Sequence, residues 1–357
     1  MPFVTPAGVH AEWGPAPGRR RRYRAPGRVN LIGDHTDYAG GLVLPCAVDR
    51  HICLTASPSA ELRLESDRAS GVVELNADGT GTADGWGAYA AAVARELADA
   101  GRPAIGLAGA LTSDLPDGAG LSSSAGLEVC LAVALCDVAR FPLGGLELAA
   151  LCQRAEMRAV GVPCGIMDQA AIVLGRAGHA LMLDCGTLEH EYVGIPEELA
   201  VVVIDSGERR ELAASGYADR RREVERGLAG DDGEVSHRRL RHVRSENERV
   251  RATVDALRRG RYDDLGAIFH ASHQSLRTDF EVTTPRLDRL VDLCYESGAL
   301  AARMTGGGFG GSLVALVRAD VHRQVAERVV DRFRDEAGCD GELSWRRMTP
   351  ADGAGRC

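Results

Sequence analysis

A glycine- and serine-rich loop runs directly into a long apolar helix and narrows the folds open to this chain. Residues 115–125 read LPDGAGLSSSA, and the strongly helical stretch behind them continues to about residue 139. Small residues let backbone N–H groups face an anion, and the helix N-terminus adds the positive end of its dipole. A plain helix N-cap needs one serine rather than three. The segment therefore favours a phosphate-binding site over a structural cap.

The composition shows which kinds of phosphate site this loop is not. The 357 residues include no lysine, so all 42 basic residues are arginine. This excludes the Walker-A GK[ST] motif, the protein-kinase strand lysine and a Schiff-base lysine. The spacing of the glycines and the Pro-containing turn also exclude a dinucleotide GxGxxG loop. If the chain handles ATP, it does so by another route.

Charge and cysteine content limit the partners and the compartment. The net charge of −9 disfavours a general nucleic-acid-binding protein, and the arginines at 19–22 read as a solvated approach to the first strand. No apolar run approaches the ~18 residues of a membrane span, and no secretory signal is expected. None of the ten cysteines forms a CxxC pair, and several stand in apolar runs. These are typical of buried free thiols, so we expect a cytoplasmic location.

The length predicts about two domains. We expect a tail over residues 1–22, an N-terminal domain over 23–185 and a C-terminal domain over 186–357. Strands are expected at 28–33, 42–48, 51–56, 61–66, 105–113, 180–184 and 200–205. Helices are expected at 86–100, 146–160, 165–174, 212–227, 239–259, 286–297 and 319–337. Residues 228–237, LAGDDGEVSH, read as an exposed loop between two helices.

A second loop, RVNLIGDHTDYAGG at residues 28–41, concentrates polar chemistry in a few positions. Asp34, His35 and Asp37 place two carboxylates and an imidazole close together. An ordinary turn rarely needs this set. It suits a polyhydroxylated ligand, because carboxylates accept hydroxyl protons in strong hydrogen bonds. A metal site is the less favoured alternative, since no second His or Cys stands at ligand spacing.

Three further features are weak when taken singly. Residues 304–311, MTGGGFGG, carry five glycines in eight positions, which implies close backbone approach to a ligand or another loop, or else a bulged turn. Asp168, in VPCGIMDQA, has apolar neighbours whose burial could shift its pKa, although alone it reads as a helix cap. Glu156 alone reads as a solvated helix residue.

In their order along the chain these segments resemble the GHMP small-molecule kinases, and specifically the galactokinases. PGRVNLIGDHTDYAGG resembles the galactokinase signature, and LPDGAGLSSSAGLEV resembles the ATP-phosphate loop of that family. GVPCGIMDQ, SGYADRRRE, RHVRSENERV, SHQSLRTDFEVTTPRLD and ARMTGGGFGGSLVAL also match in order. The resemblance runs from about residue 24 to 317, which is most of the chain.

The resemblance implies an α+β, two-domain GHMP kinase fold with the active site in the interdomain cleft and no Walker lysine. The implied reaction transfers the γ-phosphoryl group of MgATP to the anomeric O1 of galactose, which gives galactose 1-phosphate and ADP. Asp168 matches the catalytic carboxylate near O1, and Arg28 matches the residue that neutralises charge beside it. Phosphoryl transfer depends mostly on positioning and charge neutralisation, so these roles are chemically reasonable.

The resemblance also implies binding residues and partners. Sugar-binding positions match Asp34, His35, Thr36, Asp37 and Tyr217. The ATP phosphates match Gly118, Ala119, Gly120, Leu121, Ser122, Ser123 and Ser124. Mg²⁺ matches Ser124 and Glu156, which suffice because Mg²⁺ takes few carboxylates besides phosphate oxygens. The partners are then a sugar and ATP, with no nucleic acid and no membrane, and we expect a monomer.

The sugar loop departs from the family pattern at one position. The family reads Gly-Glu-His-Thr-Asp where this chain has Gly33, Asp34, His35, Thr36 and Asp37. The shorter Asp34 carboxylate draws back by on the order of 1 Å. Losing a charged hydrogen bond of ~1.5–3 kcal/mol would weaken sugar binding roughly 10- to 100-fold. Either the loop shifts so that the shorter carboxylate still reaches the sugar, or the sugar that binds differs from galactose at C6.

Two alternatives to galactose phosphorylation therefore stay open. One is an anomeric kinase for another galactose-configured sugar, such as galacturonate, arabinose or N-acetylgalactosamine. The other is a non-catalytic regulator that binds sugar and ATP. Intact Arg28, Ser124, Glu156 and Asp168 argue against the regulator.

Overall fold

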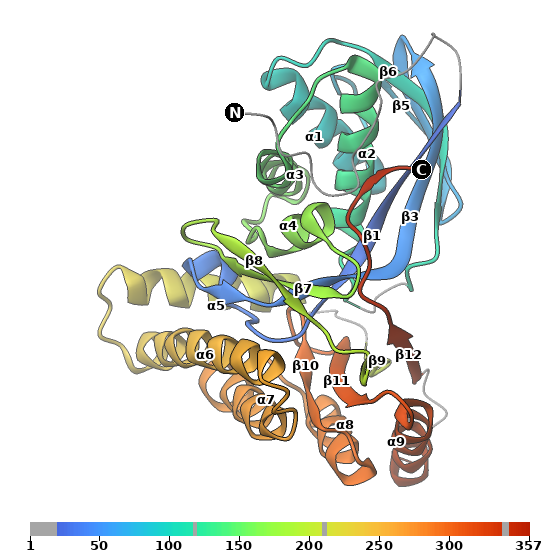
Figure 1. The fold of residues 1–357 in the computed structure, drawn as a ribbon. Helices are drawn as coiled ribbons and strands as arrows, with labels where there is room; N and C mark the ends of the chain where they lie inside the picture. The colour runs from blue at the N-terminus through green and yellow to red at the C-terminus, as the bar shows by residue number, and fades with distance from the viewer. Residues whose placement is uncertain (1–19, 117–119, 209–212, 338–342) are drawn as a thin grey trace.

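The computed structural model describes residues 20–116, 120–208, 213–337 and 343–357, and these form a mixed α+β protein (Figure 1). In that part of the chain the strands make a six-stranded, a four-stranded and a three-stranded sheet. Gly118 and Ala119 of the predicted phosphate loop lie outside the described residues. None of the described helices is both long and apolar enough to cross a membrane.

The six-stranded sheet and its helices form the upper part of the molecule in Figure 1. In sheet order its strands are β13 (Gly355–Arg356), β1 (Arg21–Asn30), β3 (Pro45–Ser59), β6 (Gly106–Ser113), β4 (Glu61–Ser66) and β5 (Ala69–Asn76). Neighbours are antiparallel except β4 and β6, which run parallel. One side of the sheet is covered by α1 (Trp86–Asp99), α2 (Ser123–Ala139), α3 (Gly145–Val160) and α4 (Met167–Leu174). The core between them is mostly alanine, valine and leucine.

The second large sheet is antiparallel and lies in the lower part of the molecule (Figure 1). Its order is β10 (Ala301–Thr305), β11 (Ser312–Arg318), β9 (Leu199–Asp205) and β12 (Ser344–Met348). Its helices are α5 (Ala213–Leu228), α6 (Glu234–Arg258), α7 (Asp264–Ser275), the π-helix η2 (Leu276–Phe280), α8 (Pro285–Ser297) and α9 (His322–Ala337). The small sheet joins β2 (Leu42–Val43), β7 (His179–Asp184) and β8 (His190–Gly194).

Two local expectations are wrong. The helix α6 begins at Glu234, directly after Gly233, so the last part of the expected loop 228–237 is helical. An acidic residue in the first turn of a helix is stabilised by the dipole, which explains this start. At the amino end, β1 begins at Arg21, whose Nη1 is 2.8 Å from Asp137 Oδ2. Arg21 is therefore paired rather than solvated, whereas Arg20 and Arg22 are exposed as expected and Arg19 lies outside the described residues.

Strand pairing links the two expected domains in two places. The last strand, β13, pairs with β1, so the carboxyl end of the chain returns to the first sheet. The hairpin of β7 and β8 crosses the expected boundary at residue 185. The boundary itself stays a prediction. These returns bring the end of β1, the start of α2, the start of α4 and the turn between β10 and β11 close together, and the predicted site residues lie there.

Candidate active site

The centre of the site is an ion pair between Arg28, near the end of β1, and Asp168, in the first turn of α4. Arg28 Nε is 2.7 Å from Asp168 Oδ1, and Nη2 is 2.8 Å from Oδ2. The third guanidinium nitrogen, Nη1, donates to the carbonyl of Gly120 at 2.6 Å. The Arg28 side chain is 6% exposed and that of Asp168 is 28% exposed. The two-pronged contact fixes the carboxylate while leaving it open to a substrate.

The serine-rich loop lies against this pair. Ser122 stands at the N-cap of α2 with a left-handed φ of 56°, and its hydroxyl donates to Asp168 Oδ2. Leu121 is buried, and its carbonyl accepts from the backbone N–H of Arg28 at 3.1 Å. Ser124 donates from Oγ to Glu156 Oε1 at 2.9 Å. The loop and both carboxylates therefore form one connected group.

Ser123 opens α2 and is exposed at the helix N-terminus. Together with the half-exposed Ser122 and Ser124, it lines the end of α2 where the helix dipole is positive. This arrangement suits an anion such as a phosphate group.

Glu156 belongs to a buried polar group that the sequence analysis missed. Its Oε2 accepts from Gln169 Nε2 at 2.6 Å, and the same nitrogen donates to Glu128 Oε2 at 3.1 Å. Burial, with Glu156 nearby, raises the pKa of Glu128 to about 10, so this side chain is a neutral acid at pH 7. Burial and the Asp168 charge also raise the pKa of Glu156. The sequence feature that could have indicated this group is the single glutamate within the apolar run LEVCLAVAL.

The donor set around Ser124 fits a hard divalent cation. A hydroxyl oxygen and a carboxylate oxygen, Ser124 Oγ and Glu156 Oε1, meet at 2.9 Å beside the phosphate loop. Within the described residues no group of three or more His, Cys, Asp or Glu side chains could hold a metal ion. A cation here would take its other ligands from phosphate oxygens and water, as Mg²⁺ commonly does in kinases.

Asp34 of the polar loop is engaged by the carboxyl-terminal half of the chain. Its Oδ2 is 2.6 Å from Arg303 Nη1, and its Oδ1 accepts from the N–H of Gly306 at 2.8 Å. Asp34 is 1% exposed. The glycine-rich segment 304–311 thus makes the close backbone approach to another loop that the sequence predicted.

His35 and Thr36 take different positions in the same loop. Burial lowers the pKa of His35 to about 3, so its ring is neutral. That ring lies 4.7 Å from the Phe280 ring and 5.6 Å from the Tyr217 ring. Thr36 is fully buried, and its Oγ1 is 2.7 Å from the Leu42 carbonyl. His35 therefore faces the other aromatic rings, whereas the Thr36 hydroxyl braces the loop.

Asp37 and Tyr217 reach the same cluster from two different elements. Asp37 opens the 3₁₀ turn η1 (Asp37–Ala39), and a Cβ added to Gly165 would lie 1.6 Å from Asp37 Oδ2. Burial first, and then the Asp168 charge, raises the pKa of Asp37 to about 7. The Tyr217 ring of α5 lies 5.6 Å from that of Tyr38. The structure thus brings the five predicted sugar-binding residues into one cluster. The polar groups of Asp34 and Thr36, however, contact other parts of the protein.

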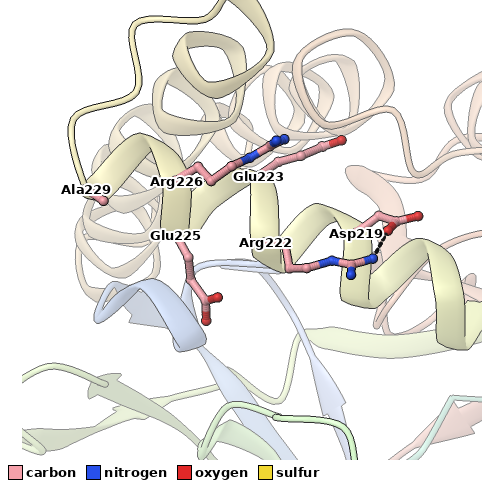
Figure 2. Close-up of a pocket in the computed structure, with 6 residues that line it drawn as sticks. All are labelled: Asp219, Arg222, Glu223, Glu225, Arg226 and Ala229. Atoms are coloured by element: carbon pink, nitrogen blue, oxygen red, sulfur yellow. Dashed lines mark hydrogen bonds and ion pairs between the residues drawn. The ribbon is translucent and has the colours of Figure 1, made fainter.

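A surface groove on α5 is separate from this cluster, because none of the predicted site residues lines it (Figure 2). Its lining residues are Asp219, Arg222, Glu223, Glu225, Arg226 and Ala229. Arg222 and Asp219 pair with each other across one turn. Arg222, Glu225 and Arg226 are exposed, whereas Glu223 is half-buried and pairs with the buried Arg239.

Comparisons with known proteins identify the family of this chain. The profile of the galactokinase galactose-binding signature matches residues 12–58. Profiles of the GHMP kinase N-terminal and C-terminal domains match residues 88–176 and 253–335. Both of these domains are present in a chain of mixed helices and sheets, so the expected α+β GHMP kinase fold is confirmed.

Among individual relatives, galactokinase from Thermococcus kodakarensis is 38% identical over 325 residues, with 86% of this chain and 93% of that protein covered. The crystal structure of Lactococcus lactis galactokinase complexed with galactose matches with a TM-score of 0.88 and 31% identity, covering 96% of this chain and 97% of that one. Mevalonate kinase from Methanococcus jannaschii, at 19% identity and a TM-score of 0.70 over 93% of this chain and 99% of its own, shares the fold. With 38% identity to a galactokinase over most of its length, this chain belongs to the galactokinase family.

Proposed function

We propose that this protein transfers the γ-phosphoryl group of MgATP to the anomeric O1 of galactose and releases galactose 1-phosphate and ADP. Its family makes it a sugar kinase acting on two small molecules, a sugar and ATP. The observation that carries the proposal is the Arg28–Asp168 pair, which links the start of the polar loop to α4 and accepts a hydrogen bond from Ser122 of the phosphate loop.

Asp168 is the group nearest to the chemistry in this proposal. Its carboxylate, held by Arg28 and Ser122, accepts a hydrogen bond from the sugar O1 hydroxyl and receives its proton as the bond from O1 to the γ-phosphorus forms and the bond from that phosphorus to the bridging oxygen breaks, so that ADP leaves with that oxygen. Arg28 offsets the negative charge that gathers as the phosphoryl group approaches. A positioned base contributes about 10²- to 10⁴-fold, and the rest of the acceleration comes from alignment and electrostatics.

The loop from Gly118 to Ser124 binds the ATP phosphates in this proposal, with the N-terminus of α2 supporting the negative charge. Ser124 and Glu156 hold Mg²⁺, which when bound neutralises phosphate charge. The donor set of one hydroxyl and one carboxylate supports that assignment.

His35, Asp37 and Tyr217 contact the sugar in this proposal, because their polar groups stand at the cluster. Asp34 and Thr36 shape the loop, since their oxygens are engaged by Arg303, Gly306 and Leu42. We propose that one chain suffices as a monomer, because all these residues belong to it. The described cysteines are free thiols, which supports a cytoplasmic location.

A coupled ADP-release assay tests the reaction. MgATP is supplied with galactose, galacturonate, arabinose, N-acetylgalactosamine or glucose, and Asp168→Asn serves as the inactive control. We expect strong turnover on galactose and a loss of at least about 10²-fold in kcat in the control. Turnover on another sugar but not on galactose would show that the other sugar is the substrate. Sugar binding by calorimetry with no turnover would favour a regulator.

A further inference from the structure

Glu128 is a buried acid that the proposed chemistry does not use. It lies on α2, it is fully buried, and its Oε1 has no hydrogen-bond partner among the described residues. Its Oε2 accepts from Gln169 Nε2 at 3.1 Å. Burying a carboxyl group with so few partners is unfavourable, so a glutamate here calls for a reason beyond packing.

Gln169 bridges two carboxyl groups through one amide nitrogen. Nε2 carries two hydrogens, and it lies 2.6 Å from Glu156 Oε2 and 3.1 Å from Glu128 Oε2. Gln169 is itself fully buried. Because both hydrogens are used, Glu128 fixes the rotation of the amide, and the amide fixes one oxygen of Glu156.

The other oxygen of Glu156 is the one that meets the phosphate loop. Oε1 accepts from Ser124 Oγ at 2.9 Å, whereas Oε2 is occupied by Gln169 and lies 3.7 Å from the Cys164 sulfur. We propose that Glu128 and Gln169 are positioning residues that hold Glu156 so that Oε1 faces the cation. This inference deepens the proposed function and rests on it.

Gln169 is also the sequence neighbour of the proposed catalytic carboxylate. Gln169 follows Asp168 in the first turn of α4, so the same turn holds the carboxylate at the sugar and the amide at Glu156. Residues that orient a metal ligand in other proteins typically change metal affinity by roughly 10- to 100-fold when removed. We expect that range for Gln169→Leu and a smaller effect for Glu128→Leu.

The experiment measures Mn²⁺ binding with ADP by electron paramagnetic resonance, so it does not depend on turnover. The variants are Gln169→Leu, Glu128→Leu, Glu128→Gln and Glu156→Gln. Asp137→Asn is the matched control, because Asp137 is another buried acid of α2 but pairs with Arg21 and Tyr23 instead. Thermal unfolding and galactose binding by calorimetry report whether each variant is folded.

We expect Gln169→Leu to weaken Mn²⁺ binding roughly 10- to 100-fold, with galactose affinity within about twofold of the parent. Glu128→Gln keeps an oxygen that accepts from Gln169, so it should restore most of the binding that Glu128→Leu loses. The inference is overturned if folded Gln169→Leu binds Mn²⁺ like the parent, if Asp137→Asn weakens binding equally, or if Glu156→Gln has no effect. A parent that binds Mn²⁺ through Glu156 but does not phosphorylate galactose would refute the proposed function alone.

Discussion

The residue that departs from the family pattern, Asp34, has no free carboxylate oxygen. Arg303 Nη1 lies 2.6 Å from one oxygen and the Gly306 N–H donates to the other at 2.8 Å. A glutamate here would need space for one more methylene in a site that is 1% exposed. The short side chain is therefore matched to its two partners.

Asp34→Glu accordingly should not improve the enzyme. We expect overpacking to lower the free energy of unfolding by about 1–3 kcal/mol and to raise the KM for galactose. Urea unfolding and steady-state kinetics on galactose check both effects. A higher kcat/KM at unchanged stability would show that the glutamate reaches the sugar and that the departure limits the natural protein.

The two-pronged contact of the Arg28 guanidinium with Asp168 gives a second prediction for a single residue. Arg28→Lys keeps the charge but removes the two-pronged contact with Asp168. We expect kcat to fall by about 10²- to 10³-fold. Arg24→Lys is the control, because Arg24 is an exposed arginine on the same strand and should leave kcat unchanged. Equal kcat values for the two variants would contradict the role of Arg28.

The raised pKa of Asp37 predicts that kcat/KM for galactose depends on pH. Its pKa is raised to about 7, so in the folded protein it is neutral below and ionised above that pH. Because the ionised form accepts hydroxyl protons, kcat/KM for galactose should rise as pH increases through about 7. Asp37→Asn should remove that rise. The native state also holds a proton that the unfolded chain has released between pH 4 and 7, so Asp37 makes stability fall with rising pH across that window.

Elements were predictable from sequence where the signal was local. The helices of the first half and the strands of residues 61–66 and 106–113 follow from hydrophobic periodicity. The short strand β8 was missed although its hairpin partner β7 lies just before it. The short strand β12 was missed because it is stabilised by β9, a partner strand distant in sequence. The glutamate–glutamine group on α2, α3 and α4 was missed for the same reason, since its members meet only after three helices pack.

The helix α5 rests on the glycine-rich segment, and this contact predicts how Tyr217 is positioned. A Cβ added to Gly216 would lie 2.7 Å from Phe309 Cζ. Gly216→Ala should displace α5 and raise the KM for galactose between about 10- and 100-fold while the KM for ATP stays constant. Arg222→Ala, on the exposed side of α5, is the control (Figure 2). A parallel rise of both KM values would indicate general distortion instead.

At the scale of the whole molecule, one buried arginine joins segments from both halves of the sequence. Arg303 on β10 lies 2.6 Å from Asp34 and 3.6 Å from Glu246 of α6, and all three side chains are at most 1% exposed. Burial opposes ionisation of Glu246, but the charge of Arg303, the other basic neighbours and a hydrogen bond from Ser272 together outweigh it and lower the pKa of Glu246 to about 2. Local sequence patterns carry no sign of this contact, because its partners are separated by most of the chain.

Removing that arginine leaves the buried Asp34 carboxylate without its cation and leaves Glu246 paired with Arg249 alone. We expect Arg303→Met to lower the free energy of unfolding by about 3–5 kcal/mol at pH 7, whereas the exposed Arg323→Met changes it by at most about 0.5 kcal/mol. In the parent, the depressed pKa of Glu246 gives stability that is present above pH 4.5 and lost as pH falls towards 2. In the variant Glu246 keeps Arg249 but loses Arg303, so burial outweighs more of the remaining stabilisation and Glu246 takes up a proton at higher pH than in the parent. The difference in stability from the parent should therefore narrow as the pH falls from 7 to 5. Urea unfolding at both pH values measures this, and a difference that stayed constant would mean that Arg303 stabilises the molecule by packing rather than by charge.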